Sequence, residues 1–216
     1  MNAYFISGLG ADRRAFCRIK LPAGFTATYI DWIAPLPKET LSSYALRLAK
    51  VIDASAPFVL IGLSMGGMMS VEIAKVLKPK LVILISSIKC RKELPWYYKL
   101  AGTFYLDRLM PASSLKKASF MSYYFVGTPD HDSRHLLKQL TKDSDLAFVR
   151  WAIRAILTWK NTTVPENIFH IHGTKDNILP IRFTKPDVSI PNEGHFMVYT
   201  KGYQVSEIIR KKLDSL

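Results

Sequence analysis

A serine between two glycines follows an apolar run in this chain, and this arrangement could activate a hydroxyl group. The segment Gly62-Leu63-Ser64-Met65-Gly66 comes directly after Phe58-Val59-Leu60-Ile61. A strand that delivers a serine to a sharp turn, with a helix starting at once, holds the hydroxyl in a strained, accessible position. A helix start at Met65 would also aim free backbone N–H groups at whatever Ser64 attacks. The pattern predicts a nucleophilic serine.

Such a serine needs a base to take its proton, and the base needs an acidic group that fixes its tautomer. Both residue types follow downstream, Asp176 in His172-Gly173-Thr174-Lys175-Asp176 and His195 in Asn192-Glu193-Gly194-His195-Phe196. Each segment comes after an apolar run that predicts a strand. Because loops at the carboxyl ends of parallel strands share one edge of the sheet, we expect Ser64, Asp176 and His195 to meet there.

The elements that would position these residues alternate between strands and helices. Apolar, β-branched runs predict strands over residues 3–7, 26–30, 58–62, 81–86, 168–172 and 187–190. Helical periodicity predicts helices over residues 41–52, 65–77 and 203–213. This alternation predicts an α/β fold with an open, mostly parallel sheet of about six strands and helices on both faces.

The alternation stops between residues 88 and 164, where the chain is basic and aromatic. Within this stretch a clear apolar stripe predicts a helix over 145–159, with Ser144 as its N-cap. We expect residues 88–164 to form a helical lid, inserted between the two parts of the core, 1–87 and 165–216. Its aromatic side chains would form the lid's own core or line an apolar pocket over Ser64.

Taken together, the Ser64, Asp176 and His195 motifs resemble those of the α/β-hydrolase superfamily, in that order along the chain. The resemblance covers the whole chain, and residues 88–164 stand where the family often carries a lid. It implies an oxyanion hole made by the backbone N–H groups of Met65 and of Leu9, in the loop after the first strand. Many relatives have a histidine where this chain has Ser7, so the shape of that loop is an open point.

These motifs predict a serine hydrolase that cleaves a carboxylic ester or thioester through an acyl-enzyme on Ser64. The substrate would be a small molecule with a largely apolar acyl group. The same scaffold could instead carry out carbon–carbon hydrolysis or a lyase step, or serve as a non-catalytic module that binds a small ligand. No cofactor and no metal is expected, since Asp130-His131-Asp132, near His135, fits a polar turn better than a metal site.

Each candidate residue also has a purely structural explanation. Ser64 could lie in an ordinary tight turn, Asp176 could only cap the residues after it, and His195 could be a packed surface side chain. Glu193 could compete with Asp176 for the imidazole. Two further histidines fit a place in the core of a strand better than a ligand role: His170 and His172.

Composition narrows the partners and the compartment. The 216-residue chain carries a formal net charge of +13, but its basic residues are spread along its length and no nucleic-acid-binding motif accompanies them. Nucleic acid is therefore not an expected partner. Its two cysteines have no metal-type spacing, no apolar run is long enough to span a membrane, and we expect no signal peptide before the first strand. A cytoplasmic protein is expected, with its oligomeric state open.

Overall fold

A fully parallel sheet of six strands forms the centre of the part that the computed structural model describes, residues 1–111 and 120–216. The strands are β1 (Asn2–Ile6), β2 (Thr26–Ile30), β3 (Phe58–Leu63), β4 (Leu81–Ile85), β5 (Ile168–Gly173) and β6 (Val188–Ile190). Their order is β2-β1-β3-β4-β5-β6, and every neighbouring pair is parallel. The predicted fold class is confirmed, and the predicted strand limits differ from the observed ones by one residue at most.

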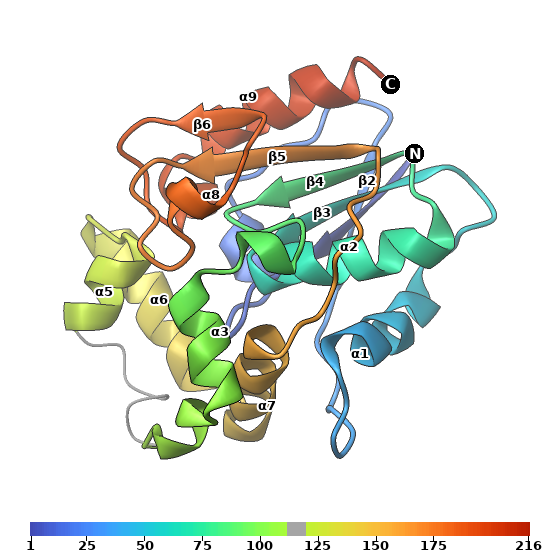
Figure 1. Ribbon diagram of the computed structural model, residues 1–216. Coiled ribbons are helices and arrows are strands. Elements are labelled where there is room, and N and C mark those ends of the chain that lie inside the picture. The colour runs from blue at the N-terminus through green and yellow to red at the C-terminus, as the bar shows by residue number, and fades with distance from the viewer. Residues whose placement is uncertain (112–119) are drawn as a thin grey trace.

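Helices cover both faces of this sheet, because successive side chains of a strand point to opposite sides. Leu60 of β3 joins one buried apolar cluster and Ile61 joins the other. The first cluster includes α1 (Leu41–Leu48) and α2 (Met65–Leu77), and the second includes α8 (Met197–Thr200) and α9 (Gly202–Leu213). Figure 1 shows α9 on one side of the sheet and α1 and α2 on the other.

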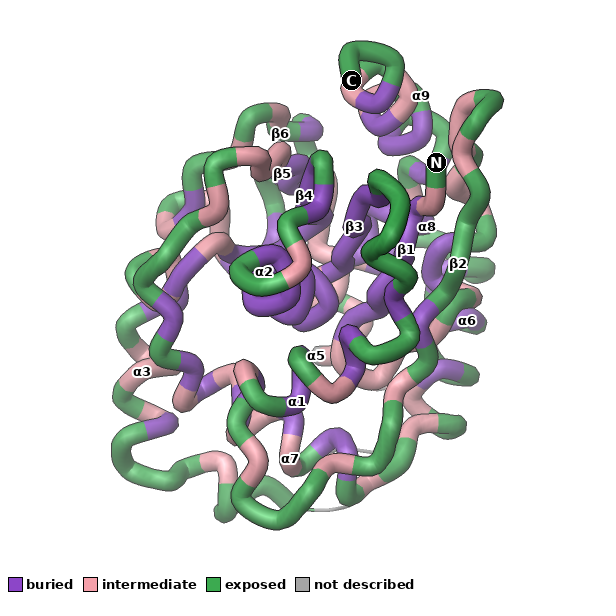
Figure 2. Tube along the Cα trace, turned by 90° about the vertical axis from the view of Figure 1, so that its right-hand side faces the viewer, coloured by how far each residue is buried: buried purple, intermediate pink, exposed green. Residues whose placement is uncertain are grey.

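The strand–helix unit that carries Ser64 lies at the centre of the molecule. Every residue of β3 is buried, as is every residue of α2 from Met65 to Ala74. Figure 2 shows this buried centre, with β3 and α2 surrounded by more exposed segments. An all-apolar strand and a helix that is apolar nearly all round are the patterns of elements covered on both sides. The predicted helix over 65–77 is confirmed at both ends.

Residues between β4 and β5 form the described helices α3 (Trp96–Thr103), α5 (Phe120–Val126), α6 (His131–Asp143) and α7 (Leu146–Leu157). Residues 112–119 of the predicted lid lie outside the described part. Side chains of α7 join the apolar cluster of α1 and α2, whereas Leu136 and Leu140 of α6 join the cluster of α9. This insertion therefore packs against both faces of the sheet. Its division from the core at residues 88 and 164 stays a prediction.

Two local expectations for the insertion were wrong. The N-cap of α7 is Asp145, whose carboxylate accepts a hydrogen bond from Phe148 N at 2.7 Å, while the predicted cap, Ser144, bonds elsewhere. The expected polar turn at Asp130 is instead the start of α6, because the Asp130 carboxylate accepts from Ser133 N at 2.8 Å. An N-cap and a polar turn use the same short polar side chains, so local sequence does not separate them.

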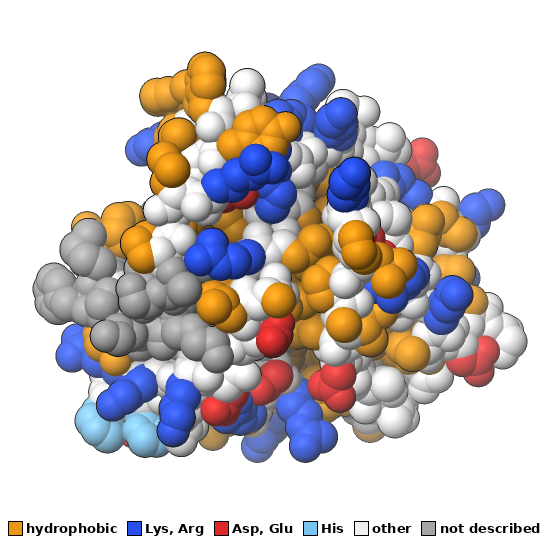
Figure 3. Space-filling model, turned by 90° about the horizontal axis from the view of Figure 1, so that it is seen from below, with side chains coloured by type: hydrophobic (Ala, Val, Ile, Leu, Met, Phe, Trp, Pro, Cys, Tyr) orange, Lys and Arg blue, Asp and Glu red, His pale blue; other side chains and the backbone are white. Residues whose placement is uncertain are grey.

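Basic side chains do not gather into one patch on the face of the molecule that lies at the bottom of Figure 1. Figure 3 shows lysine and arginine side chains dispersed among hydrophobic and uncharged ones. Across residues 1–111 and 120–216, no helix has the length and apolar character that crossing a membrane requires.

Candidate active site

Ser64 occupies the sharp turn between β3 and α2. Its backbone has φ 52° and ψ −118°, a conformation that costs free energy for a residue with a side chain. Two hydrogen bonds hold the turn from outside: Ser64 N donates to Ile85 O at 2.9 Å, and the Ser87 hydroxyl donates to Ser64 O at 2.6 Å. The strained backbone expected from the sequence is therefore present, and β4 with the residues after it keeps it in place.

The two glycines around Ser64 are required by close packing. A Cβ atom on Gly66 would collide with the carbonyl oxygens of Ile6 and Ser7, at the end of β1. A Cβ atom on Gly62 would lie 2.5 Å from the Cα of Gly67, in the first turn of α2. Both contacts are with backbone, which cannot move aside as a flexible side chain can. Glycine here allows β1 and α2 to approach the turn closely.

Ser64, His195 and Asp176 form one continuous chain of hydrogen bonds. His195 Nε2 lies 2.8 Å from Ser64 Oγ, and His195 Nδ1 lies 2.7 Å from Asp176 Oδ2. Because an ionised carboxylate only accepts, Nδ1 carries the proton and Nε2 accepts from the serine hydroxyl. The imidazole of His195 is 12% exposed and the carboxylate of Asp176 is fully buried. The structure thus brings together the three residues that the sequence predicts to meet.

Asp176 lies in the turn after β5 and uses both of its oxygens. Oδ1 accepts from Ile178 N at 2.9 Å and from Leu179 N at 2.8 Å, leaving Oδ2 for His195. The capping explanation and the orienting role are therefore both compatible with its position. Burial raises the pKa of Asp176, but its interactions with His195 and the hydrogen bond from Leu179 N outweigh burial and hold that pKa below its usual value. The carboxylate is consequently ionised at neutral pH.

Glu193 does not compete for the imidazole. Its Oε2 accepts from the Thr200 hydroxyl at 2.8 Å, and its Oε1 lies 3.6 Å from Lys201 Nζ. These partners hold the carboxylate beside α8. The alternative pairing of Glu193 with His195 is therefore not the one that the structure adopts.

The loop after β1 lies against Ser64. A Cβ atom on Gly8 would come within 3.3 Å of Ser64 Cβ. Ser7, where many relatives have histidine, donates from its hydroxyl to Ala11 O at 2.8 Å, and the indole of Trp32 donates to the same oxygen at 3.0 Å. These two hydrogen bonds fix Ala11 O, so the loop that carries Leu9 turns back on Ser7.

The two expected oxyanion donors belong to the start of α2 and to the loop after β1. Met65 is the first residue of α2, so its N–H has no partner within the helix. The N–H of Leu9 takes part in none of the hydrogen bonds found between described residues. Both groups are thus available, and their role as an oxyanion hole stays a prediction.

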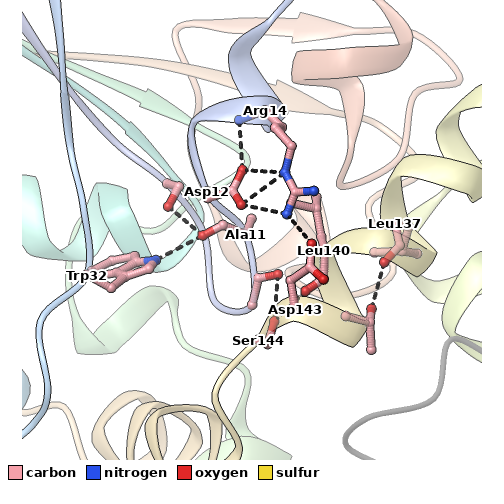
Figure 4. A network of polar contacts seen from close by, with 11 residues as sticks. Ala11, Asp12, Arg14, Trp32, Leu137, Leu140, Asp143 and Ser144 are labelled. Carbon is pink, nitrogen blue, oxygen red and sulfur yellow. Dashed lines mark hydrogen bonds and ion pairs between the residues drawn. The ribbon is translucent and has the colours of Figure 1, made fainter.

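An ion-pair cluster ties the Leu9 loop to the insertion (Figure 4). Arg14 Nη2 lies 2.7 Å from Asp12 Oδ2 and 2.8 Å from Asp143 Oδ2, at the end of α6. The Ser144 hydroxyl lies 3.1 Å from Gly10 O. Between loop and insertion is a cavity of about 490 Å³. Its apolar lining includes Trp32, Ile33, Pro35, Leu140 and Phe148.

The described residues offer no obvious place for a metal ion. Within 1–111 and 120–216, no three His, Cys, Asp or Glu side chains are grouped so that they could hold one. His131 and His135 lie on α6 with their rings stacked 6.1 Å apart, on the exposed surface and away from the Ser64 hydrogen-bond chain.

No protein-family model matches the sequence, and no curated protein sequence matches it either. The structure, in contrast, resembles many solved ones. An esterase from Exiguobacterium antarcticum (EaEST) has a TM-score of 0.76 at 17% identity, over 99% of this chain and 92% of that one. MenH from S. aureus has a TM-score of 0.74 at 16% identity, over 100% and 94%. A thermophilic esterase from Thermogutta terrifontis has a TM-score of 0.73 at 17% identity, over 100% of this chain and 90% of that one.

Identities this low establish the fold alone. The likeness nevertheless extends over nearly the whole of each chain. The chain has the α/β-hydrolase fold.

Proposed function

We propose that the protein is a serine hydrolase that cleaves a carboxylic ester or thioester of a small or medium, largely apolar acyl group. The observation that carries this proposal is the unbroken hydrogen-bond chain from Ser64 through His195 to the buried Asp176, at 2.8 and 2.7 Å. A serine that only filled a turn would have no need of a histidine held in one tautomer beside it. The esterases that share the fold support the same reaction class.

The proposed reaction begins when Ser64 Oγ attacks the carbonyl carbon while His195 Nε2 takes its proton. The carbonyl oxygen becomes an oxyanion, which the N–H groups of Met65 and Leu9 stabilise; losing one such donor typically costs about 3–4 kcal/mol of barrier. As the tetrahedral species collapses, His195 returns the proton to the leaving alcohol or thiol. Water then attacks the acyl-enzyme with His195 as base again, which releases the acid and restores Ser64.

Asp176 assists this cycle through its charge. Its carboxylate is ionised at neutral pH because its pKa lies below the usual value. Burial alone would raise this pKa, but the interactions with His195 and with Leu179 N lower it by more. A buried negative charge 2.7 Å from Nδ1 stabilises the imidazolium that forms when His195 takes the serine proton. The same bond fixes the ring so that Nε2 faces Ser64.

The cavity beside the Leu9 loop supports an apolar substrate. Gly10 forms part of its wall, in the same loop as Gly8, which packs close to Ser64. Two of its acidic residues, Asp12 and Asp143, share the single positive charge of Arg14, and the third, Asp145, caps α7. An uncharged acyl or alkyl group therefore suits it better than a charged one.

Labelling with a fluorophosphonate tests the proposal without knowledge of the substrate. Intact-mass spectrometry of the native chain should show a single adduct, and Ser64→Ala should show none. Ser55→Ala, which changes an exposed serine on a loop, is the matched control and should label like the native chain. An adduct that persists in Ser64→Ala, or a folded native chain that takes no label, would refute the proposal. A positive result leads to a series of esters and thioesters of increasing acyl length.

A further inference from the structure

Two buried histidines lie behind Asp176 and have no part in the proposed reaction. His170 and His172 alternate on β5, so their side chains share one face of the sheet, and neither has any solvent exposure. His170 Nε2 lies 3.0 Å from His172 Nδ1, and His172 Nε2 lies 2.8 Å from Leu179 O. Buried histidines cost folding free energy unless each polar nitrogen is used, so this pair calls for a physical explanation.

The partners fix which nitrogens carry protons. Leu179 O is a carbonyl and can only accept, so the proton of His172 must be on Nε2. His172 Nδ1 is then an acceptor, which requires His170 to donate from its own Nε2. This leaves His170 Nδ1 without a proton; it makes no hydrogen bond of good geometry among the described residues, although the backbone of Ser87 acts on the ring. Burial lowers the pKa of both histidines, in keeping with two neutral rings.

This arrangement reaches Asp176 by two routes. Leu179 donates from its N–H to Asp176 Oδ1 at 2.8 Å while its carbonyl accepts from His172, so the ring holds the turn that holds the carboxylate. In addition, His172 Nε2 lies 3.4 Å from Asp176 Oδ2, the oxygen that bonds His195. The positive end of the His172 N–H dipole therefore faces the reacting side of Asp176.

We propose that His172 is a positioning residue for the reaction: as a neutral ring protonated on Nε2, it holds the turn from Asp176 to Leu179 and orients Oδ2 toward His195. The proposal rests on the proposed function. His170 keeps His172 in the required tautomer. Replacing His172 should disturb Asp176 far more than a buried substitution elsewhere that lowers the stability of the fold by a similar amount.

Few other titratable or charged groups face this pair. From α3, Tyr98 donates its hydroxyl to Ile178 O at 3.0 Å, and burial raises its pKa to about 12, so it stays neutral. From the segment after β4, the charge of Lys89 acts on His170, while its ammonium donates to Lys185 O at 2.6 Å. From the residue before β6, the Asp187 carboxylate accepts from the backbone N–H of His170 at 2.8 Å, and His195 lies across Asp176. None of these groups could replace the N–H of His172 beside Oδ2.

The test measures the second-order rate constant of fluorophosphonate labelling as a function of pH. In His172→Phe, the plateau should fall about tenfold, since a hydrogen-bond donor that serves a charged group is lost. The acid limb should move to higher pH, because an Asp176 carboxylate that loses its facing N–H dipole holds the imidazolium more strongly. His172→Gln places an amide N–H near the position of Nε2 and should restore most of the rate and the native profile.

Trp159→Phe is the matched control. It removes another buried hydrogen bond, from the indole to Glu72 Oε1 at 2.7 Å, far along α2 from Ser64. It should lower the melting temperature but leave the pH–rate profile unchanged. If His172→Phe labels with the native profile and rate, or if Trp159→Phe changes the profile equally, the role of His172 is refuted. A native chain that never labels would instead refute the proposed function.

A measurement on the native protein covers the case in which His172→Phe does not fold. Nitrogen-15 NMR of the histidine rings should show His172 as the neutral Nε2–H tautomer from pH 6 to pH 8. An exposed histidine, with a pKa of about 6.5, changes its protonation state within this pH range. His170 should show the same tautomer. A charged ring, or a proton on Nδ1 of His172, would overturn the proposal.

Discussion

The turn after β3 and the helices between β4 and β5 use large apolar residues in opposite ways. Around the turn, apolar side chains are buried without exception, from Phe58 through Ile73. In the insertion, Trp96, Phe104 and Leu109 are 61%, 67% and 77% exposed. The buried region can hold a serine in a strained conformation because everything around it is fixed. The insertion packs some of its residues on the core and leaves the rest to solvent, so it can tolerate change.

The sharpest contrast should appear between two glycines. Gly66→Ala would drive a Cβ into the carbonyl oxygens of Ile6 and Ser7, which belong to the backbone, and should lower the free energy of unfolding by about 4–5 kcal/mol. Gly24→Ala, with φ +87° but no atom within 4 Å of the new Cβ, should cost only about 1–2 kcal/mol. Urea unfolding of both variants checks this. Equal losses would mean that conformation, and not close packing, decides both positions.

Leucines from the two regions should differ next most. Leu60→Ala opens a cavity at a fully buried position of β3 and should lower the free energy of unfolding by about 3 kcal/mol. Leu109→Ala, at a 77% exposed position, should change it by less than about 0.5 kcal/mol. Denaturant midpoints of the two variants measure the difference. A large loss at Leu109 would show that the insertion is built as tightly as the sheet.

The buried histidines should make stability depend on pH. His170 and His172 stay neutral in the fold because burial lowers their pKa values from 6.5, whereas the unfolded chain protonates both below that pH. The free energy of unfolding should therefore fall as the pH drops below 6.5, by at most ~1.4 kcal/mol per pH unit for each histidine, until the pH reaches the lowered pKa of that ring. His170→Leu, which removes one of the two rings, should reduce the slope, and Leu109→Ala, at an exposed apolar position, should not alter it. A flat profile in the native chain would contradict two neutral rings.

The smallest effect is expected where the two regions meet, at the Arg14 cluster. The side chains of Arg14 and Asp143 are 37% and 54% exposed, so Asp143→Asn should cost less than about 1 kcal/mol, and high salt should remove the difference. Asp214→Asn removes a similar pair on the surface near the end of α9 and is the control. Thermal melts at low and high salt give the comparison. A decrease of more than about 2 kcal/mol in the free energy of unfolding would mean that this ion pair fixes the insertion to the core.

Local sequence predicts the centre of the fold well, because its elements depend on their own composition. The all-apolar β3, the turn at Ser64 and the helix from Met65 to Leu77 each have a pattern that allows one structure. The order of Ser64, Asp176 and His195 predicts their meeting, since parallel strands bring their carboxyl ends to one edge. What the sequence lacks is any sign of how far the hydrogen bonds extend beyond them.

Contacts between distant segments are what remained hidden. Nothing in the sequence relates the hydroxyl of Ser7 or the indole of Trp32 to Ala11 O, and nothing relates Ser87 to the backbone of Ser64. The alternation of His170 and His172 on a predicted strand did place both on one face, which is a signal that could have been used. The helix α6 was missed because its first turn is polar and its start resembles a turn.

The hydrogen bond between His195 and Ser64 joins residues 131 positions apart in the chain. The turn at Ser64 already depends on Ile85 and Ser87, but its base comes from much further along the chain, beyond the insertion and β5. Contacts of such long sequence separation form slowly. On the proposed mechanism, a chain leaving the ribosome or refolding from urea has an unreactive Ser64 until His195 reaches it. Recovery of labelling during refolding would then time the completion of the fold.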